Sequence, residues 1–109
     1  MDDRELLKLA AKAAGYGVKF DDRLTAGIWT PESGVKRCYW NPLEEDGDAL
    51  RLAVEIGITV AFWECPQNSV AAYVSGDGIP ASSERHGEDK GAATRRAIVR
   101  AAAAIGWAM

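Results

Sequence analysis

Apolar residues return every three or four positions in three segments of the chain, which is the period of an amphipathic helix. The segments are residues 3–14, 46–56 and 90–105. The side chains expected to be buried are Leu6, Leu9, Ala10 and Ala13 in the first segment, Leu50, Ala53 and Val54 in the second, and Thr94, Ala97, Ile98, Ala101 and Ile105 in the third. Because each helix has a single apolar stripe, each is expected to lie on the surface of a sheet.

Polar residues precede these helices and glycines follow them. Asp2 or Asp3 stands before the first helix and Asp89 before the last, where a carboxylate can accept hydrogen bonds from unpaired backbone amides. Glycine ends helices readily because it can adopt the left-handed conformation, and the expected end positions are Gly15, Gly57 and Gly106.

Strand-like alternation occupies the remaining apolar segments. Residues 17–20, 24–30 and 35–40 are expected to form a meander, with a proline- and glycine-containing turn at 31–34. Residues 58–64 and 69–75 are expected to form a second hairpin across a short loop. The polar residues 76–90 are predicted to form a loop.

The predicted element order is therefore α-β-β-β-α-β-β-α, which indicates an α+β fold in one domain over residues 1–109. Its largely antiparallel sheet of four or five strands would be covered by three helices. Residues 58–63 are apolar on both sides, which favours a central strand with helices on both faces. The prediction is thus a three-layer α/β/α sandwich.

The stretch at the start of the second helix carries the strongest local signals. Asn41 is a good N-cap, and Pro42 follows at the first helical position, where its missing N–H costs nothing. Glu44 has the spacing of a capping box. Gly47 is expected to interrupt this first turn, and Trp40 is expected to fold over the start of the helix.

Four carboxylates crowd this helix start: Glu44, Glu45, Asp46 and Asp48. Negative charge is favoured at the positive end of a helix dipole, and Asp46 or Asp48 can cap the helix again after the interruption. The alternative is a divalent-metal or acid–base site, for which Glu44, Asp46 and Asp48 are the candidates. Their spacing matches no complete calcium loop.

Composition narrows the class of protein. The 109 residues are 48% hydrophobic, which argues against a wholly disordered chain, and the net charge of −3 argues against a globally basic nucleic-acid binder. The chain has no apolar run of about 18 residues and an acidic N-terminus without a signal-peptide core, so a cytoplasmic location is expected. Cys38 and Cys65 are then expected to be ordinary reduced thiols.

Two stretches resemble a known family. Residues 40–54 (WNPLEEDGDALRLAV) look like a signature of small phage and prophage proteins with a phage ABA sandwich domain, and residues 92–102 (AATRRAIVRAA) are similar to the end of the same family. The resemblance implies an α/β/α layered fold and a phage or prophage origin, hence the cytoplasm of a host bacterial cell. It implies no activity, catalytic residue or cofactor.

Arg95, Arg96 and Arg100 form a basic edge on the last helix, with Lys90 one to two turns earlier. This edge could bind phosphates or an acidic partner. The pattern is more typical of the solvated face of an amphipathic helix.

Trp29 and Trp107 are the aromatic residues best placed to be exposed, because their alternate neighbours form the set expected to face the core. Exposed Trp and Arg concentrate binding energy at protein interfaces, so both are candidates for binding a protein partner. Trp107 and the alanine-rich last helix could also form the seam of a homodimer.

Catalytic signals are weak. His86 could pair with Ser82, Ser83 or Asp89, but no nucleophile turn surrounds either serine. Gly76-Asp77-Gly78 lacks the rest of a phosphate-binding fingerprint. No catalytic residue and no cofactor are therefore expected.

Three hypotheses follow from the sequence. The first is a non-enzymatic phage or prophage accessory protein that binds a host or phage protein. The second is a nucleic-acid-binding protein that uses the basic edge, and the third is a small metal-dependent enzyme that uses the carboxylates near Asp46.

Overall fold

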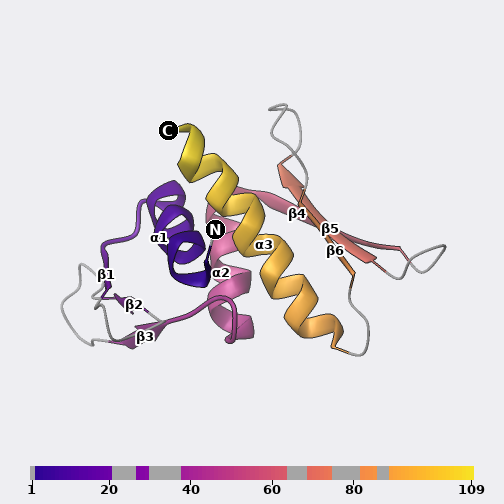
Figure 1. Cartoon of the computed structure of the whole chain (residues 1–109), viewed down its shortest axis with the longest axis horizontal. Helices are drawn as coiled ribbons and strands as arrows, with labels where there is room; N and C mark the ends of the chain where they lie inside the picture. The colour runs from indigo at the N-terminus through magenta and orange to yellow at the C-terminus, as the bar shows by residue number, and fades with distance from the viewer. Residues whose placement is uncertain (1, 21–26, 30–37, 64–68, 75–81, 86–88) are drawn as a thin grey trace.

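Three helices and six short strands make up the part of the chain that the computed structural model describes, which is residues 2–20, 27–29, 38–63, 69–74, 82–85 and 89–109 (Figure 1). The helices are α1 (Asp3–Ala14), α2 (Asp46–Ile56) and α3 (Lys90–Ala108). The strands are β1 (Val18–Phe20), β2 (Gly27–Trp29), β3 (Cys38–Trp40), β4 (Ile58–Trp63), β5 (Ser69–Val74) and β6 (Ser82–Arg85). The fold is therefore a small α+β fold, as the sequence pattern predicts.

The described strands form two antiparallel sheets of three, with the orders β1-β2-β3 and β4-β5-β6. The predicted meander and hairpin are both present, with Ile28 opposite Tyr39 in the first sheet and Val60 opposite Ala72 in the second. The expectation of one sheet of four or five strands is wrong, because the two sheets are not hydrogen-bonded to each other in the described residues.

Strand β6 lies within the segment predicted to be a loop. It pairs with β5, with Ala71 opposite Ser83. Main-chain hydrogen bonds hold a strand of any composition in a sheet, so the polar sequence of β6 carried no alternation signal. Its presence makes β5 the middle strand, and β4, expected to be central, lies at an edge of the described sheet.

Helix α3 lies on the surface of the β4–β6 sheet, as expected, but α1 and α2 cover its other side, so it occupies the centre of the molecule. It packs against α1 and α2 on one side and against β5 and β6 on the other (Figure 1). Its buried residues accordingly surround most of the helix: Ala93, Ala97, Ile98, Val99, Ala101, Ala102, Ala103 and Gly106. Because alanine has a short side chain, neighbouring elements can approach α3 from several directions. The prediction of one buried stripe did not account for this.

Gly106 does not end α3, contrary to the sequence expectation. The helix continues to Ala108, and Gly106 is buried against the backbone of Leu9 in α1. A Cβ atom at this position would lie 2.8 Å from the carbonyl carbon of Leu9 and closer still to its oxygen. Gly106 is therefore the point where the two helix backbones touch.

Helix α2 buries only one of the three residues expected, Ala53. Ala49, Leu52 and Ala53 are buried, whereas Leu50 and Val54 are 65% and 73% exposed. Apolar residues occupy more than half the circumference of this helix, so periodicity alone could not select the inward face. The packing of α2 against α3 and α1 makes that selection.

The start of α2 is built from two separate pieces. Asn41 caps a single turn, accepting from the backbone N–H of Leu43 at 3.2 Å through its side chain. The helix proper begins at Asp46, and Glu45 at its cap makes no side-chain hydrogen bond. The interruption near Gly47 is thus present, but capping by Asp46 or Asp48 is not, and Asp48 instead accepts from the backbone N–H of Asn41 at 3.0 Å.

This arrangement buries the side chains of the motif. Trp40 is 1% exposed and meets the ring of Tyr16 edge to face at a centroid distance of 5.9 Å. Pro42, two residues further along the chain, is also fully buried. Trp40 and Pro42 are therefore core residues, which agrees with the expectation that Trp40 folds over the start of the helix.

The other helix ends agree with the sequence. The backbone N–H of Glu5 donates to Asp2, and that of Ala92 donates to Asp89, each at 2.8 Å. Gly15 adopts a left-handed conformation after α1, with φ of 72°, and Gly57 does so after α2. Among the helices described, none has the length and apolar character needed to cross a bilayer.

Candidate functional site

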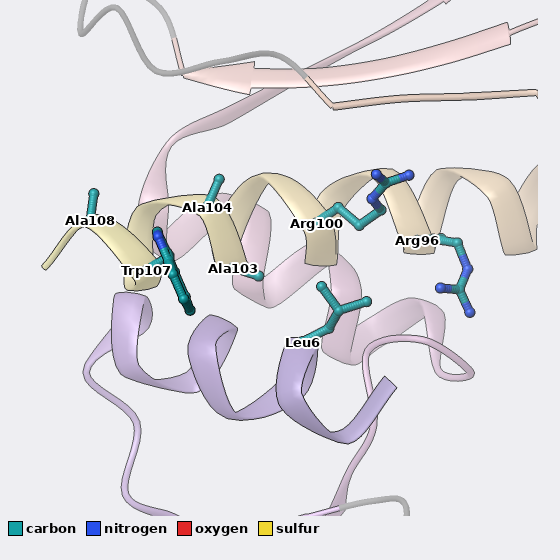
Figure 2. A pocket seen from close by; sticks show the side chains of 7 residues that line it. All are labelled: Leu6, Arg96, Arg100, Ala103, Ala104, Trp107 and Ala108. Carbon is teal, nitrogen blue, oxygen red and sulfur yellow. The ribbon is translucent and has the colours of Figure 1, made fainter. Parts of the chain in front are cut away.

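A groove runs along the contact between α1 and α3. It has a volume of about 630 Å³ and is lined by Leu6, Arg96, Arg100, Ala103, Ala104, Trp107 and Ala108. Figure 2 shows two arginines toward one end and Trp107 toward the other, with Leu6 of α1 between them. The groove thus brings together three of the five residues that the sequence singled out for binding.

The basic end of the groove contains a half-exposed ion pair. The Nη2 atom of Arg96 donates to Oδ1 of Asp3 at 3.1 Å, and the two side chains are 40% and 46% exposed. A pair with this much solvent contact contributes only about 0–1 kcal/mol. Arg96 can therefore exchange Asp3 for a carboxylate of a partner at little cost.

The apolar end of the groove is centred on Trp107. Its side chain is 73% exposed, as expected from the sequence. The Nζ atom of Lys12 donates to the backbone oxygen of Met109 at 3.4 Å and connects the end of α3 to α1. This bond and the contact at Gly106 join the backbone on both sides of Trp107 to α1.

Arg95 lies outside this groove, so the basic edge does not act as one unit. Its Nε atom donates to the backbone oxygen of Leu43 at 2.9 Å, and its Nη1 atom pairs with Asp46 at 2.6 Å. Arg95 therefore joins α3 to the start of α2, and its guanidinium is already used structurally. Lys90 lines a different groove, beside α2.

The carboxylates around α2 are also used structurally. Asp46 pairs with Arg95, and Asp48 holds the backbone of Asn41. Glu44 and Glu45 are exposed. No group of three or more His, Cys, Asp or Glu residues suited to a metal ion occurs among the residues that the structure describes. The geometry therefore gives no support to the metal site proposed from Glu44, Asp46 and Asp48.

Several sequence candidates lie where the structure describes no side chain. His86, Cys65 and Gly76-Asp77-Gly78 fall outside the described residues, and only the backbone is described for Trp29, Cys38, Ser82 and Ser83. Asp89, the remaining member of the possible triad, caps α3.

Tyr16 is a partly buried phenol beside α2. Burial raises the pKa of its phenol, and the nearby Glu55 carboxylate adds to the effect while Arg51 opposes it. Its hydroxyl donates weakly to the backbone oxygen of Arg51 at 3.5 Å. Since its ring packs on Trp40, Tyr16 is a core residue with a polar edge rather than a catalytic acid.

No protein-family model, characterised protein or solved structure matched this chain. The resemblance to phage ABA sandwich proteins therefore stays a prediction from the sequence.

Proposed function

We propose that this protein is a non-enzymatic interaction module, a phage or prophage accessory protein that binds a host or phage protein through the α1–α3 groove. The observation that carries the proposal is that Arg96, Arg100 and Trp107 line one groove with an apolar floor. Arginine and tryptophan are the residues in which binding energy concentrates at protein interfaces.

The groove favours a partner segment that combines an apolar side chain with a carboxylate. The apolar side chain would lie over Ala103 and Ala104 against Trp107, whose large exposed ring loses water on binding. The carboxylate would face Arg96, replacing Asp3 in the half-exposed pair. Because the donor is an arginine, this contact can be bidentate, which adds specificity.

The family resemblance adds the three-layer α/β/α arrangement to the proposal. That arrangement requires a helix on the face of the β4–β6 sheet opposite to α3.

The test is affinity capture of the tagged protein from a bacterial lysate at low and moderate salt, followed by mass spectrometry and a nucleic-acid assay. We expect a specific protein that survives moderate salt and is lost with Trp107→Ser and with Arg96→Glu. Tyr39→Ser is the matched control, since Tyr39 is an equally exposed aromatic residue, 70% exposed, on β3.

Two outcomes would overturn the proposal. Capture that is unchanged by both groove variants would place the interface elsewhere. If nucleic acid is captured instead of a protein and dissociates steeply with salt, the result would support the nucleic-acid hypothesis, with Arg100 as a phosphate-binding residue.

A further inference from the structure

A second groove lies on the other side of α3, between α2, β4 and α3. It has a volume of about 800 Å³ and includes Leu50, Val54, Ile58 and Ile98. Leu50 and Val54 are one helical turn apart, so they form a continuous apolar stripe on the exposed face of α2. Exposed apolar side chains that adjoin in this way mark interaction sites more often than isolated ones do.

We propose that this face of α2 binds a second copy of the same chain, with the two α2 helices antiparallel about a two-fold axis level with Leu52. In this arrangement Leu50 of each copy lies opposite the partner's Val54. The two-fold axis makes the contact closed and self-complementary. The inference does not depend on the α1–α3 groove or on its partner.

The charges bordering the stripe fit a second copy. Arg51 and Glu55 lie on the same side of the stripe, one turn apart, and both are exposed. An antiparallel copy brings the partner's Glu55 to Arg51. The two-fold axis then also brings Glu55 of the first copy to the partner's Arg51. Arg51 also lies 3.8 Å from Asp48 of its own chain, and this contact remains in the dimer.

The two ends of α2 fit the same arrangement. The last turn of α2 has no basic residue to interact with its terminal carbonyl groups, which carry partial negative charge. Lys90 lines the groove together with Asp46, at the opposite end of the helix. An antiparallel partner places its negative helix end near Lys90, while Asp46 is neutralised by Arg95 at 2.6 Å.

The surface at both ends of the stripe is open among the residues that the structure describes. Gly47 and Gly57 lie one turn beyond Leu50 and Val54, and a Cβ atom built at either glycine meets no atom within 4 Å. This distinguishes the α2 face from the α1–α3 contact, where Gly106 is already occupied by Leu9.

The test is sedimentation equilibrium of the full chain across micromolar to millimolar concentration. We expect a monomer–dimer equilibrium that Leu50→Asp weakens at least about 100-fold, because two buried leucines are lost per dimer and two charges must be desolvated. Leu50 is exposed in the monomer, so the melting temperature of the dilute variant should be unchanged. Tyr39→Asp is the control that leaves the equilibrium unaltered.

A charge exchange tests the orientation. Arg51→Glu alone should weaken the dimer by about 10-fold, since two attractive contacts become repulsive, and the double variant Arg51→Glu/Glu55→Arg should restore it. A monomer at every concentration would overturn the inference, as would a dimer that resists Leu50→Asp. Dissociation by Trp107→Asp instead would place the seam at the end of α3, and failure of the double variant to restore the dimer would refute the antiparallel pairing.

Discussion

Replacing Gly106 with alanine separates the local preference of α3 from its tertiary packing. Considered as a helix residue alone, alanine is more favourable than glycine by about 0.8–1 kcal/mol. The added methyl group, however, would meet the Leu9 carbonyl group, whose carbon lies 2.8 Å from the Cβ position. The neighbouring atoms belong to a helix backbone, so no side-chain rotation can relieve the contact.

The expected cost follows from this geometry. The helices must separate, and overpacking of this kind costs about 1–3 kcal/mol. A gap of about 0.5–1 Å also forfeits a quarter to a half of the dispersion attraction between atoms on the two sides. Taking the upper part of this range, and subtracting the helix-propensity gain, we expect a net loss of about 2 kcal/mol.

Thermal and urea unfolding measure this loss. A net loss of about 2 kcal/mol should lower the melting temperature by about 8–12 °C in a domain of this size. The matched control is Gly47→Ala in α2, where a Cβ atom meets nothing within 4 Å. That variant should be neutral or more stable, by up to about 1 kcal/mol. A Gly106→Ala protein as stable as the wild type would refute the close α1–α3 contact.

Three further predictions concern single side chains. Leu52→Ala should cost about 2–5 kcal/mol of unfolding free energy, because Leu52 is fully buried, whereas Leu50→Ala in a dilute sample should cost less than about 0.5 kcal/mol; the reverse order would mean that α2 is rotated as the sequence stripe predicted. Asp89→Ala should cost about 0.5–2 kcal/mol by removing the cap on Ala92, and Asp89→Asn should retain most of the stability; equal losses would exclude a capping role. The raised pKa of Tyr16 means that folding favours the neutral phenol, so stability should be complete below the unfolded-state pKa of about 10 and should fall as the pH rises from there through the higher folded-state value. Urea unfolding at alkaline pH should show this loss, and Tyr16→Phe should reduce it.

The α1–α3 groove was partly foreseeable. The sequence singled out Arg96, Arg100 and Trp107, because exposed arginines and a tryptophan after a helix are visible as a pattern. It could not separate Arg95 from its neighbours, because only the fold brings Leu43 and Asp46 within reach of that guanidinium. The apolar floor was also invisible, since it is formed by alanines that look like ordinary core residues.

Local chemistry determined where the elements begin and end. Asp2 and Asp89 cap their helices and Gly15 and Gly57 terminate theirs, because capping and left-handed conformations depend on residues adjacent in the chain. The hairpin of β4 and β5 follows in the same way from alternation on both sides of a short connection.

Tertiary packing decided which surfaces these elements bury. Gly106 has the sequence of a helix end, yet the approach of Leu9 makes it an interior contact and lets α3 continue. Leu50 and Val54 have the spacing of a core stripe, yet α2 turns Leu52 inward and leaves them exposed. The physical reason is that periodicity records how many apolar faces a segment has. Which of those faces is covered depends on neighbours that are distant in the sequence.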